Sequence, residues 1–129
     1  MNRASGKGFW NRVSGMTMER GEHVVGLTIE QLRKLCDEGV IQWTAHITTR
    51  MLQRRITRED VISAIRSGEI IEQYPDDYPF PSGLVLGLLL SGLPLHVVCG
   101  VGMGEVYMIT CYTPNPHEWD SDFRRRAQR

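Results

Sequence analysis

Gly68 divides the chain into two parts whose apolar residues follow different spacings, and this division sets the expected fold class. From residue 28 to Gly68, apolar side chains recur three or four positions apart, as they do on one face of a helix. Beyond Gly68 they form short, partly β-branched stretches separated by Gly, Ser and Pro, which is typical of strands joined by hairpins. Helices followed by strands in a chain of 129 residues predict a single α+β domain.

The first part contains three short expected helices. Capping residues at their starts and glycine or cationic residues at their ends place them at residues 28–39, 44–55 and 57–68. Residues 1–27 carry few apolar anchors and are expected to form a loosely ordered lead-in. The α+β domain is therefore expected to span residues 28–129.

The second part predicts four strands and a terminal helix. The strands are expected at residues 69–74, 84–90, 95–101 and 105–112. Ser91-Gly92 and Gly102-Met103-Gly104 are hairpin signals, so the sheet should be antiparallel throughout. Trp119 and Phe123 lie four residues apart and favour a short C-terminal helix. The expected fold is a set of N-terminal helices packed on a small twisted antiparallel β-sheet, with that helix at the end.

The charge balance excludes a whole-molecule attraction for polyanions. Fifteen Lys and Arg residues cancel fifteen Asp and Glu residues, so the molecule has no net field that would recruit nucleic acid or an anionic membrane. A polyanion must therefore be bound by a local patch. One such patch lies within nine residues and comprises Arg50, Arg54, Arg55 and Arg58.

Cysteine usage and hydropathy indicate the compartment. Three cysteines without C-x-x-C spacing fit a reducing environment better than a disulfide framework. The longest apolar stretch, residues 84–95, is interrupted and too short to span a membrane, and no secretory signal is present. A cytoplasmic protein without membrane association is expected.

Candidate site residues come from the second expected helix and the last expected hairpin. His46, Arg50 and Arg54 are spaced four apart and form one polar stripe of the helix. If the hairpin is centred on Met103, His96 lies opposite Thr110, and Tyr112 follows two residues further along the same face. The stripe is expected to face these sheet residues.

These residue types suit phosphodiester chemistry. Guanidinium groups match a phosphate or its transition state, so Arg50 and Arg54 are the expected substrate-binding residues. In metal-independent RNA cleavage the ribose 2′-hydroxyl attacks its own phosphate, and His46 and His96 could share the proton transfers. Tyr112 or Thr110 could position the attacked group. A structural interpretation stays open for both histidines, because a buried imidazole can be satisfied within the fold.

Metal and cofactor sites are not expected. His96 and Cys99 are three apart on a strand and point to opposite faces, and no pair of His or Cys residues has structural-zinc spacing. The chain also lacks the P-loop, the dinucleotide-binding glycine pattern, the G-x-S-x-G elbow and the H-E-x-x-H motif. We therefore expect neither a metal nor a cofactor.

Several motifs in the second half of the chain resemble a known family. They are Ala45-His46, Arg50-Met51, Arg54, residues 68–75, Leu95-His96-Val97-Val98 and residues 109–114, with Trp119 beyond them. Together they resemble the bacterial family catalogued as domain of unknown function 4258. The resemblance implies a fold similar to the small RelE, ParE and BrnT toxins, an RNA target and an antitoxin protein as partner. It points to the same six residues: His46, Arg50, Arg54, His96, Thr110 and Tyr112.

Two function classes follow from the sequence. The first is a toxin-like, metal-independent endoribonuclease of a bacterial toxin–antitoxin pair. The alternative is a non-enzymatic binding module for an anionic ligand or a protein partner, in which the arginine stripe is a recognition surface. A third interpretation treats the polar residues as a scaffold that joins helix to sheet.

Overall fold

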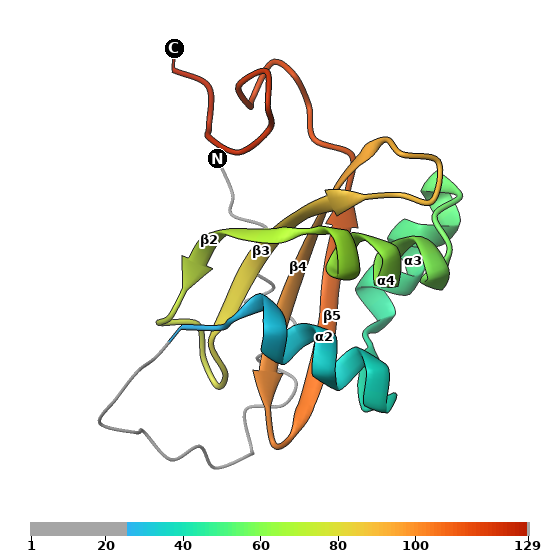
Figure 1. Ribbon diagram of the computed structural model, residues 1–129, viewed down its shortest axis with the longest axis vertical. Helices are drawn as coiled ribbons and strands as arrows, with labels where there is room; N and C mark the ends of the chain where they lie inside the picture. Colours follow the sequence, from blue (N-terminus) through green and yellow to red (C-terminus); the bar gives the residue numbers. More distant parts are fainter. Residues whose placement is uncertain (1–25, 129) are drawn as a thin grey trace.

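The computed structural model describes residues 26–128, which form three helices and one five-stranded sheet (Figure 1). The helices are α2 (Ile29–Glu38), α3 (Ala45–Arg54) and α4 (Arg58–Ser67). The strands are β1 (Ile41–Trp43), β2 (Glu69–Tyr74), β3 (Ser82–Leu88), β4 (Pro94–Gly102) and β5 (Glu105–Tyr112). The mixed α+β class is confirmed. The lead-in expected at residues 1–27 lies outside the described residues, except for its last two positions.

Local capping chemistry sets the helix ends. The Thr28 hydroxyl accepts the backbone N–H of Gln31 at the start of α2, and Gly39 ends that helix in the left-handed conformation, with φ of 74°. Thr57 and Asp60 form a complete capping box at the start of α4. These hydrogen bonds satisfy backbone groups that would otherwise lack partners, so each short helix begins and ends at a defined residue.

The sheet order is β1-β5-β4-β3-β2, and it corrects the expectation of an entirely antiparallel sheet. Strands β2 to β5 are antiparallel neighbours, but β1 pairs with β5 in parallel. The register joins Ile41 to Val106 and Trp43 to Met108. A three-residue strand has too few positions for a recognisable alternation, so the sequence pattern did not predict β1.

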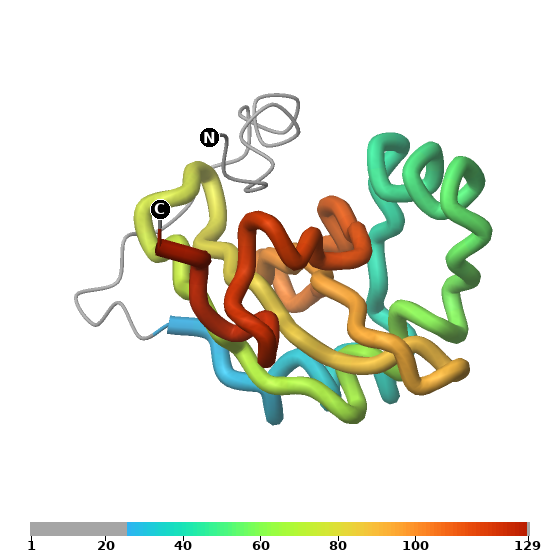
Figure 2. Tube along the Cα trace, turned by 90° about the horizontal axis from the view of Figure 1, so that it is seen from above, coloured from blue at the N-terminus to red at the C-terminus, as the bar shows by residue number. Residues whose placement is uncertain are grey.

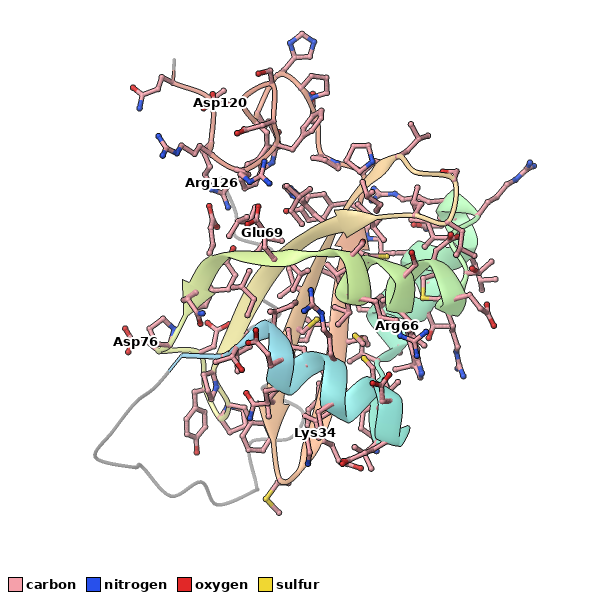
Figure 3. The ribbon with its side chains drawn as sticks, in the orientation of Figure 1. Lys34, Arg66, Glu69, Asp76, Asp120 and Arg126 are labelled. Carbon is pink, nitrogen blue, oxygen red and sulfur yellow. The ribbon has the colours of Figure 1, made fainter. Side chains whose placement is uncertain are left out.

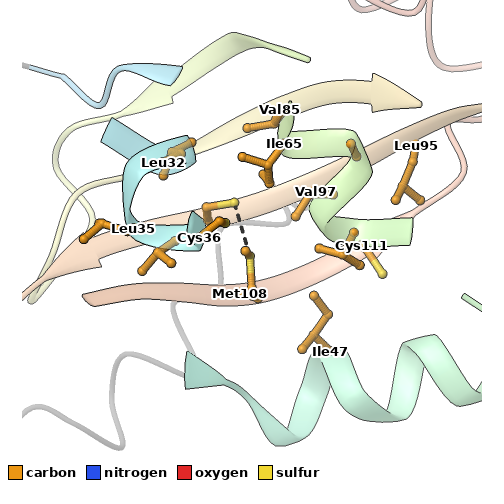
Figure 4. Packing of buried hydrophobic residues seen from close by; sticks show 14 of the residues in the cluster. Leu32, Leu35, Cys36, Ile47, Ile65, Val85, Leu95, Val97, Met108 and Cys111 are labelled. Carbon is orange, nitrogen blue, oxygen red and sulfur yellow. Dashed lines mark hydrogen bonds between the residues drawn. The ribbon is translucent and has the colours of Figure 1, made fainter. Parts of the chain in front are cut away.

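Helices cover one face of the sheet and enclose the larger hydrophobic core (Figure 4). The buried residues include Leu32 and Leu35 from α2, Ile47 from α3 and Ile65 from α4, against Val97 from β4. Helix α4 lies directly on β3, because a Cβ atom added at Gly87 would be 2.0 Å from the carbonyl oxygen of Ala64. The glycine therefore permits the close approach of helix and strand.

The other face of the sheet carries a smaller cluster covered by the end of the chain. Its buried members are Tyr74, Phe80, Leu84, Val98, Tyr107, Ile109 and Trp119. Figure 2 shows the terminal stretch, in red, passing over the strands, and Trp119 is its buried anchor. The two faces of the sheet thus pack against different parts of the chain.

The terminal stretch is not the helix that was expected. It forms consecutive turns closed by an isolated antiparallel bridge between Trp119 and Arg126. The Asp120 backbone N–H donates to the Arg125 carbonyl over 2.8 Å, and the Asp122 carboxylate accepts the Arg124 N–H. Phe123 adopts a positive φ of 62°, which no α-helix allows. These turns and the bridge between Trp119 and Arg126 take the place of the helix that the spacing of Trp119 and Phe123 favoured.

Candidate functional site

Thr44 fixes the start of helix α3 to the edge of the sheet. Its hydroxyl accepts the Ile47 backbone N–H over 3.1 Å and donates to the Ile109 carbonyl over 3.1 Å. The Thr44 N–H also donates to the Met108 carbonyl, so the chain passes from β1 into α3 while still bonded to β5. This buried residue holds the polar stripe of α3 in a fixed place beside β5.

The polar stripe of α3 presents cations to solvent. His46 and Arg54 are exposed and Arg50 is half-buried. The Arg50 guanidinium donates to the side-chain oxygen of Gln53 over 3.3 Å, and Arg54 donates to the Cys111 carbonyl over 3.5 Å. Within residues 26–128 neither arginine forms a salt bridge with a carboxylate. Both guanidinium groups keep donors that a bound anion could use.

Two further arginines extend this cationic surface. Arg55 ends α3 in the left-handed conformation and is exposed. Arg58 begins α4 and its guanidinium carbon lies 4.9 Å from the ring centroid of Trp43. We call these four arginines the α3 cationic face, which comprises Arg50, Arg54, Arg55 and Arg58.

His96 lies elsewhere, on the sheet face that the end of the chain covers. Val97 and Cys111 belong to the helix-side core, so the alternating residues His96 and Tyr112 point to the opposite face. The His96 ring is buried and meets Trp119 edge-on, with 4.5 Å between ring centroids. The expectation that the α3 stripe faces His96, Thr110 and Tyr112 across one cleft is therefore wrong, because the helix and these residues lie on opposite faces of the sheet.

The hairpin register differs from the expected one but keeps the shared face. His96 pairs with Tyr112, and Thr110 pairs with Val98. The turn lies between Gly102 and Glu105, and the register shifts again between Val98 and Cys99, because β5 has one extra residue opposite them, Ile109. The two effects move the partner of His96 by two residues, so Thr110, Tyr112 and His96 still lie on one side of the sheet.

The His96 imidazole is neutral in this environment. Burial lowers the pKa of His96 to about 4, and the opposing effects of the Phe123 carbonyl and of Glu72 are smaller. Its Nε2 lies 3.0 Å from the Phe123 carbonyl oxygen, which can only accept, so Nε2 carries the proton. Nδ1 is then a buried acceptor with no hydrogen-bond partner in the described part of the chain. The arrangement disfavours proton uptake by His96 while the ring stays covered.

The charged neighbours of His96 are Glu72 and Arg126, which the sequence did not single out. Arg126 donates from Nε and Nη2 to the two carboxylate oxygens of Glu72, over 3.0 and 3.1 Å. The Tyr74 hydroxyl donates to the same carboxylate over 2.6 Å. Burial alone would raise the pKa of Glu72, but these hydrogen bonds outweigh it and hold the pKa below its ordinary value.

Figure 3 shows the carboxylates of β2 beside the arginines of the terminal stretch, with Glu69 and Arg126 labelled. Arg124 forms a salt bridge with Glu69. The Arg126 guanidinium carbon also lies 4.7 Å from the ring centroid of Trp119. In the sequence, acidic residues gather after Gly68 and arginines gather near the C-terminus, but this pattern alone predicts no pairing between individual residues.

The described residues show neither a metal site nor a membrane-spanning helix. Residues 26–128 contain no cluster of three His, Cys, Asp or Glu side chains arranged to hold a metal ion. None of the helices α2, α3 and α4 is long and apolar enough to cross a membrane.

Comparison with known proteins gives one match. Residues 43–113 match the family model described as Domain of unknown function (DUF4258), which is more than half of the chain. The matched segment begins in β1 and ends just after β5, so it contains α3, His96 and Tyr112. Helix α2 and the terminal stretch with Arg126 lie outside it. No curated protein and no solved structure matches the chain.

Proposed function

This chain belongs to the DUF4258 family, as its motifs predicted, and from that premise we propose that it is a toxin-like RNA-binding protein. The α3 cationic face binds the phosphates of RNA. The observation that carries the proposal is the state of Arg50 and Arg54, which have no carboxylate partner within residues 26–128. Guanidinium groups in this state are suited to bidentate hydrogen bonds with phosphate oxygens.

The geometry of α3 supports phosphate binding over a merely solvated helix face. Arg54 is oriented by its bond to the Cys111 carbonyl, and the helix itself is fixed by Thr44. A positioned guanidinium loses less conformational entropy on binding than a free one. Trp43, half-buried under Arg58, adds an aromatic surface of the kind that nucleobases stack on.

Metal-independent endoribonuclease activity is the second candidate function, and the position of His46 favours it. His46 lies one helical turn before Arg50 and is exposed, so a bound phosphate and an imidazole would share one surface. Here His46 would take the proton of the ribose 2′-hydroxyl while Arg50 and Arg54 stabilise the developing charge. His96, Thr110 and Tyr112 are left out of this proposal, because the terminal stretch covers the face that carries His96.

The test is binding and cleavage of a labelled single-stranded RNA by purified protein. Replacing Arg50 and Arg54 together by Ala should weaken binding by about tenfold to a hundredfold, since two charge-assisted contacts are lost. Arg66→Ala is the matched control, because Arg66 is an exposed arginine already paired with Asp37. Fluorescence anisotropy at low salt gives the dissociation constants. Equal loss in the double variant and the control would refute a role for α3.

The His46→Ala variant separates the two candidate functions. If the protein binds RNA without catalysis, the His46→Ala variant should bind RNA as tightly as the natural chain, and neither of the two should cleave it. An endoribonuclease should cleave RNA in the natural form and lose cleavage, but not binding, in the variant. Growth arrest on controlled expression in a bacterium, scored for the same variants, reports whether the activity is of the toxin type.

A further inference from the structure

The terminal stretch, residues 114–128, covers a second site that is independent of α3. We propose that the sheet face beneath it is a peptide-docking site, occupied in cis by residues 114–128 and open to a partner segment that carries an arginine and an aromatic residue. Residues 114–128, called the terminal stretch above, are named the C-terminal segment from here on. The C-terminal segment occupies the site and therefore competes with the partner segment for it.

The contacts of the C-terminal segment define what the site recognises. Trp119 is only 2% exposed and packs its ring against His96. Arg126 makes a two-pronged bond with Glu72, the geometry in which guanidinium recognises carboxylate most specifically. The site therefore has two parts: the position beside His96 where the Trp119 ring packs, called the aromatic slot, and the Glu72 carboxylate. A ligand that fits must offer a flat ring and a guanidinium on one segment.

The C-terminal segment is not a strand of the sheet. Its backbone hydrogen bonds close within itself, from Asp120 to Arg125 and from Ala127 to Glu118. It meets the sheet through side chains and through the bond between His96 and the Phe123 carbonyl. The segment can therefore leave as a unit while all four antiparallel strands remain paired.

The covered state leaves a polar group unsatisfied. Nδ1 of His96 is buried without a hydrogen-bond partner in the described residues, and such a group costs free energy relative to its hydrated form. A partner segment that placed a donor near Nδ1 would remove this cost, which the cis segment does not. The cis segment thus satisfies one of the two ring nitrogens of His96, Nε2, and leaves the other without a partner in the described residues.

The family match ends where the C-terminal segment begins. Residues 43–113 form the matched part, and Pro114 and Pro116 follow directly. Proline fixes φ and cannot continue the β5 ladder, so the strand ends and the segment is joined by a stiff connection. The sheet face with His96 and Tyr112 thus belongs to the family domain, whereas its cover is an extension beyond the match.

The test uses the full chain and, as probe, a synthetic peptide of residues 114–128. The chain carries substitutions that weaken the contact of its own C-terminal segment with Glu69 and Glu72. In the Arg124→Gln/Arg126→Gln chain the labelled peptide should bind measurably. In the natural chain, the tethered segment competes at an effective concentration on the order of millimolar, so the same peptide should bind at least about tenfold more weakly. A peptide with Trp119 replaced by Ala is the matched control for the aromatic slot.

A second measurement reports whether the cover opens. Diethyl pyrocarbonate modification, mapped by mass spectrometry, should leave His96 unreactive in the natural chain and label it in the double variant. His46 and His117 are exposed and serve as internal standards. If the double variant is misfolded by circular dichroism, Arg124→Gln alone replaces it, because Arg124 and its partner Glu69 are about half exposed.

Two results would overturn the proposal. If His96 becomes reactive but the peptide binds neither chain, the sheet face is no docking site. If His96 in the variant reacts only when denaturant unfolds the whole molecule, the C-terminal segment is part of the core and not an exchangeable occupant. Adding Glu72→Gln to the double variant should abolish peptide binding, while His96 should still react with diethyl pyrocarbonate.

Discussion

His96 shows how strongly one residue's role depends on what covers it. Its ring lies edge-on to Trp119 and to Tyr112, with Glu72 and Arg126 as the charged groups nearby. The aromatic rings exclude water, so the neutral imidazole is favoured. Burial likewise raises the pKa of Tyr112 to about 12, which keeps its hydroxyl protonated. In the covered site, His96 and Tyr112 are therefore both uncharged, and Glu72 and Arg126 form a salt bridge beside them.

The low pKa of His96 makes the folded state sensitive to mild acid. The pKa is 6.5 in the unfolded chain and about 4 in the folded one, so between these values the unfolded chain binds more protons. The stabilisation is complete above pH 6.5 and is lost as the pH falls towards 4. The loss approaches tenfold in the unfolding equilibrium for each pH unit and amounts to about 3 kcal/mol in all.

Urea denaturation at a series of pH values measures this effect. The His96→Gln variant should have a flatter profile between pH 6.5 and 4.5 than the natural chain, and the His117→Gln variant, at an exposed histidine, is the matched control. Glu72 has a lowered pKa, so the stability it contributes is lost only below its ordinary value of 4.5, outside this window. Identical slopes for the natural and His96→Gln chains would show that the imidazole is not held neutral.

At the scale of single elements, local signals predicted the helices well. Threonine caps, the acidic first turn after Thr57 and the glycine after α2 act within one turn of chain, so they can be recognised without knowing the fold. The C-terminal segment was mispredicted for the opposite reason. Its conformation depends on docking Trp119 and Arg126 against β2 and β4, which no four-residue spacing encodes.

Thr44 joins the start of α3 to β5 at a buried position. Thr44→Ala removes a helix cap and leaves the Ile109 carbonyl without its side-chain donor. We expect a loss of about 2–3 kcal/mol in the free energy of unfolding, since both effects occur at one buried position. Thr57→Ala removes an exposed cap and should cost about 1 kcal/mol.

Chemical denaturation of Thr44→Ala, Thr44→Ser and Thr57→Ala checks this expectation. Serine keeps the hydroxyl, so Thr44→Ser should recover most of the stability that alanine loses. If Thr44→Ala costs no more than Thr57→Ala, the bond to the Ile109 carbonyl contributes nothing to the stability of the fold.

Across the whole molecule, the parallel β1–β5 pair decides which residues can form a site. It brings residues 41–43 beside residues 106–108 and so places α3 at the β5 edge. The sequence predicted the candidate residues on α3, β4 and β5, but not their relative placement. Pairing between strands far apart in sequence is set by the packing of all elements together, and a three-residue strand carries no local record of it.

The neutral charge of the whole molecule makes salt dependence a specific test of the RNA binding that we propose. With a formal net charge of +0, the affinity must come from local phosphate contacts and not from a general field. For single strands, the logarithm of the binding constant falls with the logarithm of salt concentration by about 0.7 per phosphate neutralised. Four arginines of the α3 cationic face therefore predict a slope of roughly −2 to −3.

Replacing Arg50 and Arg54 by Ala should make this slope shallower by about 1.4, because two phosphate contacts are removed. The terminal Arg124 and Arg126 already pair with Glu69 and Glu72, so replacing them should leave the slope unchanged. Titrations of one RNA at several salt concentrations, for the natural chain and both double variants, distinguish the two surfaces. A slope that changes with the terminal arginines and not with those of α3 would move the RNA site to the C-terminal segment.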